Sequence, residues 1–235
     1  DNSSIDFLED LNAPAYKIAS FELIDLPLIQ YAAATGKPMI ISTGMANEEE
    51  IQEAIATAQD NGCKELAILH CVSGYPAPSS DYNLKTIPDM ISRYGYVTGL
   101  SDHTLDNTSA IVGIALGASI IEKHFTLDRN GDGPDDSFSL EPVDFMNLCN
   151  EAKSAWNALG CIDYTHKESE KQNLKFRRSI YAVKNISAGD KLTHNNIRSI
   201  RPGFGLPPKL FKEIVGKTAK VNIDIGTPLN FEHII

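Results

Sequence analysis

The first 126 residues alternate short apolar runs with stretches in which apolar residues recur at helical spacing. Each run has the length of a strand, is rich in residues that favour β-structure, and is followed at once by polar residues. The pattern predicts five buried strands that each lead into a polar loop. The predicted strands cover residues 16–20, 38–42, 66–70, 97–101 and 119–124.

Helices with recognisable ends lie between and after these strands. Asn47 predicts a helix start, because Glu50 stands three residues later in capping-box spacing, and Gly62 predicts its end. A second helix with one apolar side is predicted to stop at Gly160. The repeated alternation of strand and helix indicates an α/β fold of parallel βα units. The apolar side of the second helix consists of Phe145, Leu148, Cys149, Ala152, Trp156 and Leu159.

Charge divides the chain into two segments. Residues 1–160 hold 8 Lys and Arg against 24 Asp and Glu, a balance of −16, whereas residues 161–235 hold 13 against 7, a balance of +6. Such an asymmetry indicates two modules. It also argues against nucleic acid as a partner, because phosphate backbones require clustered Lys and Arg, and the basic segment is too dilute in both.

The basic segment opens with a polar, poorly periodic stretch at 161–175, which predicts a linker. An internal repeat follows, in which a frame of Ile, Gly, Leu and Ile recurs at the same spacing. Two such frames predict a small pseudo-symmetric domain with glycine turns. The frames are Ile186, Gly189, Leu192 and Ile197, and then Ile223, Gly226, Leu229 and Ile234.

The four cysteines form no CxxC pair and have no metal-ligand spacing, which predicts free thiols in a reducing cytoplasm. No apolar run approaches the ~18 residues of a membrane span, and no charged and then apolar leader opens the sequence. The expected protein is therefore soluble and cytoplasmic, without a membrane partner.

Polar side chains follow all five predicted strands. In parallel α/β folds the functional groups gather at the carboxyl ends of the strands, where core packing requires no polar residue. We therefore expect one shared active site above these ends, although Ser, Thr and Asp at such positions also cap helices. The candidates are Lys17, Ser20, Glu22, Ser42, Thr43, His70, Ser73, Tyr75, Ser101, Asp102, His103, Thr104, Glu122 and His124.

His103 and His124 stand at the ends of two successive predicted strands. Neighbouring strand ends are about 5 Å apart, so both imidazoles can reach one metal ion that keeps open positions for water and substrate. The residues alone leave a second interpretation equally open. In it, one His is a hydrogen-bonded strand-end residue and the other is a general base without metal.

Lys17 lies on a strand that should lead into a buried, water-poor mouth, where a lone Lys needs an anion. Two anions are possible, a substrate phosphate or carboxylate and the carboxylate of Glu122. The first would make a diffuse anion site rather than a Walker loop. Its other donors would be the hydroxyls of Ser20, Ser42 and Thr43 and the backbone around Gly44.

A loop rich in Gly, Asp and Pro, residues 128–136, follows the fifth predicted strand. A hand-type calcium loop requires a Glu at its twelfth position, and none is placed so. Two interpretations stay open. The loop either faces the substrate, with Asp135 accepting sugar hydroxyls, or is a plain Asx-turn loop.

Taken together, the strand ends resemble the sialic acid synthase family in order and spacing. Enzymes of this family condense phosphoenolpyruvate with an amino-sugar aldehyde to give nine-carbon 2-keto acids. The tail from Phe176 through Arg201-Pro202-Gly203 to Ile235 resembles the antifreeze-like (SAF) domain of the same proteins. The motifs are Lys17-Ile18-Ala19-Ser20, Ile41-Ser42-Thr43-Gly44-Met45, His70-Cys71-Val72-Ser73-Gly74-Tyr75-Pro76, Gly99-Leu100-Ser101-Asp102-His103-Thr104, Glu122-Lys123-His124-Phe125-Thr126 and Gly133-Pro134-Asp135.

The resemblance implies a partial TIM (β/α)8 barrel, with about five of its eight βα units, followed by a small α+β SAF domain. The expected boundaries are 1–160 for the barrel part, 161–175 for the linker and 176–235 for the SAF domain. Since an eight-unit barrel needs about 250 residues, about three βα units are expected to precede residue 1.

The resemblance also assigns roles to individual residues. His103 and His124 would bind a divalent ion, Mn²⁺ or Mg²⁺, and Glu122 is a candidate proton carrier. Arg201 of the partner subunit would reach the N-acyl region of the sugar in a domain-exchanged homodimer. The remaining assignments are Lys17, Ser20, Ser42 and Ser73 for phosphoenolpyruvate, and Glu22, Tyr75 and Asp135 for the sugar, while Thr43 is a substrate-binding candidate from the anion-site pattern alone.

Three segments most resemble the branch of the family that makes pseudaminic acid from 2,4-diacetamido-2,4,6-trideoxy-altrose. They are 21–23, 72–78 and 198–205. The N-acetylneuraminate branch more often has Asn at the position of Ser73. An N-acetylneuraminate or legionaminate synthase is the alternative within the family. Outside it, a class II metal-dependent aldolase, which would use pyruvate and release no phosphate, and an inactive carbohydrate-binding fragment stay open.

Overall fold

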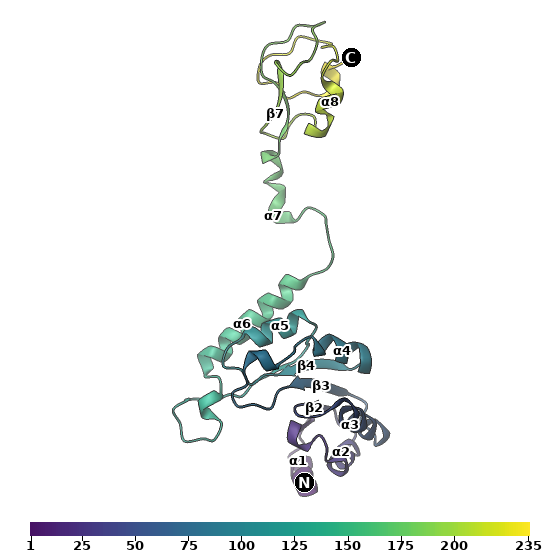
Figure 1. The fold of residues 1–235 in the computed structure, drawn as a ribbon, viewed down its shortest axis with the longest axis vertical. Coiled ribbons are helices and arrows are strands. Elements are labelled where there is room, and N and C mark those ends of the chain that lie inside the picture. The colour runs from purple at the N-terminus through teal and green to yellow at the C-terminus, as the bar shows by residue number, and fades with distance from the viewer. The chain divides into compact units, whose positions relative to one another are not determined.

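The computed structural model describes residues 1–235, which form two compact units, Asp1–Cys161 and Ile162–Ile235 (Figure 1). The division falls inside the stretch expected to be a linker. Each unit buries an apolar core of its own, with Ile41 and Ile68 central to the first and Ile180 and Leu192 central to the second. A separate core is what allows each unit to be stable by itself.

A five-stranded sheet runs through the first unit in the order β1-β2-β3-β4-β5, and every neighbouring pair is parallel. Parallel pairing of consecutive strands requires a crossover after each strand, which the intervening helices provide. This arrangement confirms the predicted α/β fold. The strands are β1 (Tyr16–Ile18), β2 (Met39–Ser42), β3 (Leu66–Cys71), β4 (Val97–Ser101) and β5 (Ile121–Glu122).

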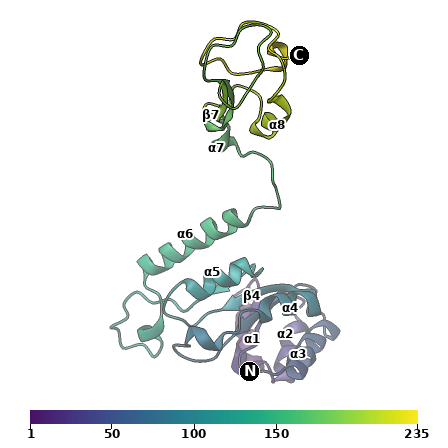
Figure 2. The ribbon, with the colours of Figure 1, turned by 45° about the horizontal axis from the view of Figure 1, so that its top comes forward.

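The crossover helices lie along the outer side of the sheet, and α2 packs against α3 (Figure 2). The helix predicted from Asn47 is α3. Asn47 Oδ1 accepts a hydrogen bond from the Glu50 N–H at 3.0 Å, and the Glu50 carboxylate accepts one from the Asn47 N–H at 2.8 Å. The helices of this unit are α1 (Asn2–Asp10), α2 (Leu26–Ala33), α3 (Glu48–Asp60), α4 (Thr86–Tyr94), α5 (Thr108–Ala115) and α6 (Pro142–Leu159), with 3-10 turns at Ser20–Glu22, Ser79–Asp81 and Asp136–Phe138.

The sheet is strongly curved. Its edges are β1 and β5, which in a flat sheet would lie about 19 Å apart, at four spacings of about 4.8 Å. However, Lys17 on β1 and Glu122 on β5 form an ion pair, with Lys17 Nζ 3.3 Å from Glu122 Oε1. Two side chains cannot span a flat sheet of that width, so the strands curl around a common axis. The first unit is therefore part of a TIM (β/α)8 barrel, as predicted.

Gly99 in β4 allows this sheet to pack closely. A Cβ atom there would lie 2.5 Å from the carbonyl oxygen of Ile120 and 2.6 Å from Leu69 Cδ2. Because one of these neighbours is backbone, we expect Gly99→Ala to lower the free energy of unfolding by about 3 kcal/mol, measured by urea denaturation. Gly36→Ala is the control, since nothing lies within 4 Å of a Cβ at that position. A loss no larger than that of Gly36→Ala would contradict the packing argument.

Helix α6 is the second predicted helix, and it ends at Gly160 as expected. Its apolar side packs only in part. Leu148 is buried together with Leu140 and Ala110 of α5, whereas Phe145 and Leu159 are exposed and Trp156 is 60% exposed. The predicted periodicity is therefore present, but most of the apolar side of α6 is not covered by the residues of this chain.

The second unit is a small α+β fold built on the predicted repeat. Ile186 and Ile223, which open the two frames, form an antiparallel bridge, and the glycines that follow them have φ values of +94° and +87°. The Leu residues of both frames are fully buried in the same core. The frames are therefore structurally equivalent. The elements of this unit are α7 (Glu168–Lys171), β6 (Ser179–Ala182), β7 (Ile197–Ile200) and α8 (Phe211–Ile214), with 3-10 turns at Leu174–Phe176, Pro208–Leu210 and Phe231–His233.

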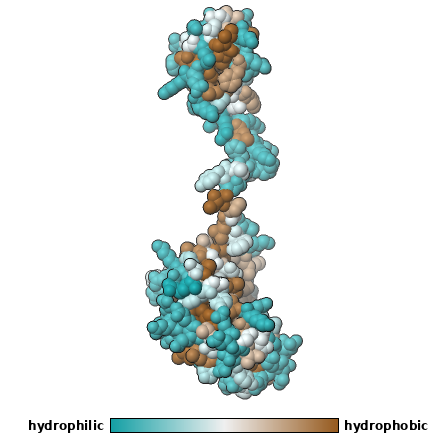
Figure 3. All heavy atoms as spheres, turned by 90° about the vertical axis from the view of Figure 1, so that its right-hand side faces the viewer, coloured by the Kyte–Doolittle hydropathy of each residue, from teal (hydrophilic) through white to brown (hydrophobic).

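The surface seen in Figure 3 is mainly hydrophilic, with apolar side chains interspersed among the polar ones. None of the helices combines the length and the apolar character that a membrane crossing requires. The four cysteines are free thiols, as predicted. Cys63 and Cys71 are buried, whereas Cys149 and Cys161 are exposed.

Candidate active site

The carboxyl ends of the strands bring several predicted residues to one edge of the sheet. The register pairs Cys71 of β3 with Ser101 of β4, and Ser101 with Glu122 of β5. Residues paired in register on parallel neighbours point to the same face of the sheet. The three side chains therefore form a row, in which Ser101 Oγ donates a hydrogen bond to Glu122 Oε1 at 2.8 Å. His103 and His124 follow this row, each two residues further along its chain segment.

The two histidines face each other, with ring centroids 5.3 Å apart. The ring of Tyr75 lies against both, at 4.3 Å from His103 and 5.7 Å from His124. Asp135 Oδ2 lies 3.5 Å from His124 Nδ1. The fold thus brings together the predicted metal ligands and two of the residues expected to contact the sugar.

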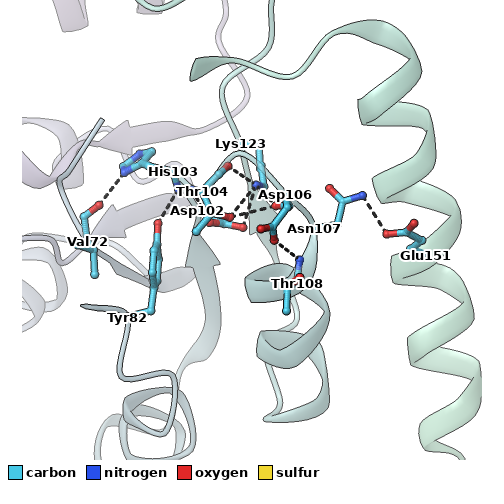
Figure 4. A network of polar contacts seen from close by, with 10 residues as sticks. All are labelled: Val72, Tyr82, Asp102, His103, Thr104, Asp106, Asn107, Thr108, Lys123 and Glu151. Atoms are coloured by element: carbon cyan, nitrogen blue, oxygen red, sulfur yellow. Dashed lines mark hydrogen bonds and ion pairs between the residues drawn. The ribbon is translucent and has the colours of Figure 1, made fainter. Parts of the chain in front are cut away.

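His103 is held in one orientation and one tautomer. Its Nδ1 lies 2.8 Å from the carbonyl oxygen of Val72, and its backbone N–H donates to the hydroxyl of Tyr82 at 2.6 Å (Figure 4). Because a carbonyl oxygen only accepts, Nδ1 carries the proton. Nε2 is then the ring nitrogen that can take up a second proton or bind a metal ion.

The environment shifts the pKa values of the two imidazoles in opposite directions. Burial alone lowers the pKa of His103, but hydrogen bonds with Cys71 and with the Val72 carbonyl raise it above its usual value. Burial and then the charge on His103 lower the pKa of His124. For the Cys71 thiol, burial raises the pKa, yet hydrogen bonds with His103 and Ser20 outweigh burial and lower it. His124 is therefore the imidazole that loses its second proton more readily, and any proton on His103 Nε2 competes with a metal ion there.

The imidazole pair fits a divalent cation that keeps open coordination positions. The Val72 carbonyl on His103 Nδ1 is the kind of outer partner that orients a metal-binding His. The chain has no cluster of three or more His, Cys, Asp or Glu side chains arranged to hold a metal. A cation held by both imidazoles would take its other donors as oxygens from water and substrate, and those oxygen donors are the ones that Mn²⁺ and Mg²⁺ prefer.

A second group of side chains surrounds Gly44 at the carboxyl end of β2. The hydroxyl oxygens of Ser42 and Ser73 are buried without a hydrogen-bond partner, and Ser20 Oγ accepts from the Gly44 N–H at 3.0 Å. A Cβ at position 44 would lie 2.2 Å from Ser73 Oγ and 2.7 Å from Ser20 Oγ, so the hydroxyls occupy the space of a side chain. Burying a hydroxyl without a hydrogen-bond partner costs free energy of folding, unless a bound ligand supplies the missing hydrogen bond. We call Ser20, Ser42, Ser73 and Gly44 the hydroxyl cradle.

Lys17 is paired with Glu122, with both side chains partly exposed at 31% and 38%. The ion pair that the sequence left open is therefore present. About a third of the Lys17 side chain reaches solvent in this five-stranded sheet, and the water-poor mouth stays a prediction for the whole barrel. An ion pair this exposed is worth about 0–1 kcal/mol, so Lys17 can exchange Glu122 for a substrate anion at little cost.

Comparison with known proteins identifies the family. The sequence model of the NeuB family matches residues 1–164, which is most of the chain, and that of the SAF domain matches residues 177–235. This chain belongs to the NeuB family. Its C-terminal part is a SAF domain, so both halves of the predicted resemblance are confirmed.

Relatives of this NeuB-family chain include synthases with different sugars in their names. Pseudaminic acid synthase of Helicobacter pylori is 40% identical over 99% of the chain and 69% of that protein, and N,N'-diacetyllegionaminic acid synthase of Campylobacter jejuni is 37% identical over 94% of the chain and 67% of that protein. The solved structure of spore coat polysaccharide biosynthesis protein SpsE of Bacillus subtilis aligns with a TM-score of 0.65 at 33% identity, covering 100% of this chain and 71% of that one. The chain spans about two thirds of the length of the curated relatives it matches.

Three further residues of the NeuB-family chain were predicted to belong to the site, namely Thr43, Glu22 and Arg201. Thr43 Oγ1 donates to the carbonyl oxygen of Leu69 at 3.1 Å, so this hydroxyl completes the end of the sheet and is not a free donor. Glu22 ends the first 3-10 turn and is exposed. Arg201 follows β7 in the second unit and is exposed, and its assignment to the sugar stays a prediction.

Two residues at the site escaped the sequence interpretation. Phe138 packs against Tyr75 and His124, with ring centroids 5.4 Å and 5.1 Å away. It lies two residues beyond the 128–136 loop, so the loop signal pointed close to it. The cysteine pattern predicts only a free thiol at Cys71, whereas the structure places this thiol in the row beside Ser101. The position of Cys71 at the end of a predicted strand is the sequence feature that could have identified it as a site residue.

The raised pKa of His103 predicts a pH-dependent metal affinity. The metal must displace the proton on His103, so we expect Mn²⁺ affinity to fall as the pH drops through a value above the ordinary pKa of about 6.5. Mn²⁺ titrations followed by electron paramagnetic resonance between pH 5.5 and 8.5 would measure this. Cys71→Ala, which removes a hydrogen bond that raises the pKa, should move the loss to lower pH. An affinity independent of pH would contradict the assignment.

The unpartnered hydroxyl of Ser42 predicts opposite effects on stability and binding. Ser42→Ala removes a buried group that has no partner, so stability should stay the same or rise by up to about 1 kcal/mol. The affinity for phosphoenolpyruvate should fall about tenfold, because a hydrogen bond to a charged ligand is lost. Thermal melts and binding calorimetry measure the two effects. In the control Ser179→Ala, where the hydroxyl donates to the Pro202 carbonyl at 2.7 Å, stability should fall with phosphoenolpyruvate affinity unchanged.

Proposed function

We propose that this chain carries the active site of a pseudaminic acid synthase. The reaction condenses phosphoenolpyruvate with 2,4-diacetamido-2,4,6-trideoxy-altrose to a nine-carbon 2-keto sugar acid and releases phosphate by C–O cleavage. The observation that carries the proposal is the position of a buried hydroxyl cradle with two unsatisfied oxygens beside a pair of imidazoles and an exchangeable Lys. An anion and an electrophilic carbonyl can bind side by side at such a site.

Phosphoenolpyruvate would occupy the cradle. Ser42 and Ser73 supply donors that lack partners, and Lys17 supplies a positive charge that can leave Glu122. Holding this reactant in line with the carbonyl it attacks is worth several kcal/mol, roughly 7–11 in well-oriented model systems.

The sugar would lie over the imidazole pair. Tyr75 and Asp135 border His103 and His124, and both offer groups that bind sugar hydroxyls. Glu22 and Arg201 of the partner subunit are proposed to complete this part of the site in a domain-exchanged homodimer.

A divalent ion held by His103 and His124, Mn²⁺ or Mg²⁺, would polarise the aldehyde carbonyl of the sugar. C3 of phosphoenolpyruvate attacks that carbon, and positive charge develops at C2. Water adds to C2, and the resulting tetrahedral carbon loses phosphate. Glu122 receives a hydrogen bond from Ser101 and lies at the end of β5 beside His124, where it can take the proton from the attacking water.

Pseudaminic acid synthases stand among the relatives with 37 to 40% identity, and a legionaminic acid synthase stands at 37%. The sequence segments around Glu22, Tyr75 and Arg201 favour the pseudaminic branch, and the legionaminic sugar is the second candidate within the family. The match of residues 1–164 to the NeuB family disfavours a class II aldolase, which would use pyruvate and release no phosphate.

The test is a phosphate-release assay with Mn²⁺ on the protein at its full natural length. Phosphoenolpyruvate is supplied with 2,4-diacetamido-2,4,6-trideoxy-altrose, with the corresponding legionaminic precursor, or with N-acetylmannosamine. We expect the highest kcat/KM with the first sugar. A preference for either of the others would reassign the substrate within the family. Turnover of none of them, with any divalent metal, would overturn the proposed function.

A further inference from the structure

Lys123 stands between Glu122 and His124 in the chain, yet its ammonium group is buried. The side chain is 2% exposed, and that of its ion-pair partner Asp102 is fully buried. Burying a Lys and an Asp is costly, and well-packed apolar residues of similar volume would often serve stability as well or better. The pair therefore calls for an explanation other than stability.

All acceptors of the Lys123 ammonium group belong to one short loop, residues 102–106, which begins directly after β4 (Figure 4). Lys123 Nζ donates to the carbonyl oxygens of Thr104 and Asp106, each at 2.7 Å, and to Thr104 Oγ1 at 3.2 Å. It also lies 3.0 Å from Asp102 Oδ2. The buried ammonium group of Lys123 thus contacts both ends and the middle of the loop.

The same loop carries His103, and it is fixed from two further directions. The Asp102 N–H donates to the carbonyl oxygen of Glu122 at 2.9 Å, which ties the end of β4 to the end of β5. On the other side, the fully buried Tyr82 accepts from the His103 N–H. Because Lys123 is bonded in the chain to His124, its contacts join the segment of one imidazole to the segment of the other.

We propose that Lys123 is a positioning residue that sets the spacing of the two imidazoles, by holding the His103 loop against the segment that carries His124. This inference rests on the proposed function, because the spacing matters only if the two imidazoles bind one divalent ion between them. Lys123 does not touch the reacting atoms in this proposal. Its direct contacts are confined to the His103 loop, whereas the hydroxyl cradle is built on β2 and on the segments after β1 and β3, so the imidazole pair should be affected most.

The test compares the double variant Lys123→Met with Asp102→Asn against the unaltered protein at its full natural length. Replacing both partners leaves no uncompensated buried charge, so the variant keeps its fold, which circular dichroism verifies, whereas Lys123→Met alone would strand the Asp102 carboxylate. The control is Lys37→Met, which breaks another partly buried Lys pair, with Glu9 at 2.7 Å, at the opposite end of β2.

Three readouts are compared. Hydrogen exchange of residues 102–106, measured without metal, should become faster in the double variant and not in the control. The Kd for Mn²⁺, measured by electron paramagnetic resonance, should rise about tenfold or more, as for other outer partners of metal-binding His residues. The affinity for phosphoenolpyruvate, measured by calorimetry, should stay unchanged, which a general loss of structure would not allow.

A folded double variant with unaltered loop exchange would overturn the positioning role, as would unaltered Mn²⁺ affinity or an equal loss of phosphoenolpyruvate and Mn²⁺ affinity. If the unaltered protein itself binds no Mn²⁺, the metal site in the proposed function is wrong. Hydrogen exchange of residues 102–106 then still decides whether Lys123 holds the loop.

Discussion

Replacement of either His103 or His124 by Ala should abolish the dependence on divalent metal and lower kcat/KM about a thousandfold. Polarisation of a carbonyl by a bound ion is worth several kcal/mol, and each 1.4 kcal/mol corresponds to about tenfold in rate. The two ring centroids are 5.3 Å apart, and loss of either ring would leave a bound ion with a single imidazole ligand. Phosphate release measured across a range of Mn²⁺ concentrations would show both effects.

His166→Ala is the matched control, since His166 lies exposed near the start of the second unit. It should keep both the rate and the metal response of the unaltered protein. A variant at His103 or His124 that retains saturable activation by Mn²⁺ would contradict the assignment of that residue. If a variant loses activity but the unaltered protein needs no added metal, a general-base role without metal becomes the better interpretation of the pair.

Gly44→Ala should raise the KM for phosphoenolpyruvate about a hundredfold. The new Cβ would lie 2.2 Å from Ser73 Oγ and 2.7 Å from Ser20 Oγ, so at least two hydroxyls of the cradle must move. Two hydrogen bonds to a charged ligand are together worth about 3 kcal/mol, which corresponds to about a hundredfold in affinity. Steady-state kinetics with the sugar at saturation measure the change.

The matched control is Gly216→Ala in the second unit, where nothing lies within 4 Å of a Cβ. It costs some stability because φ is +93°, but it should leave the KM for phosphoenolpyruvate unaltered. A Gly44→Ala variant with an unaltered KM would mean that phosphoenolpyruvate does not bind at the cradle. Phosphoenolpyruvate would then have to bind elsewhere near the imidazole pair.

Local features of the fold were open to prediction because local physics decides them. Asn47 and Glu50 form the expected capping box, since both partners lie within one turn. The strands appear where apolar runs end in polar residues, and the frames at Gly189 and Gly226 fold alike because equal spacing of Ile, Gly and Leu builds equal turns. The close approach of the His103 and His124 rings was predictable, because the two residues follow the ends of successive strands.

Features that depend on curvature and on long-range contacts were not open to prediction. The ion pair of Lys17 with Glu122 depends on how far the sheet curls, which no pattern in the sequence encodes. Lys123 was predicted only as part of a motif, because the side to which its ammonium group turns is decided by the carbonyls of the 102–106 loop. Phe138 joins Tyr75 and His124 through a loop whose path depends on tertiary packing.

The central claim is that phosphoenolpyruvate attacks the sugar and then loses phosphate by C–O cleavage at this site. The most direct test supplies phosphoenolpyruvate labelled with ¹⁸O at the oxygen that bridges carbon and phosphorus, together with the sugar and Mn²⁺, and analyses the products by mass spectrometry. The account predicts that the label leaves with the phosphate and that release requires the sugar. Label retained in the organic product, or phosphate released equally well without sugar, would contradict it.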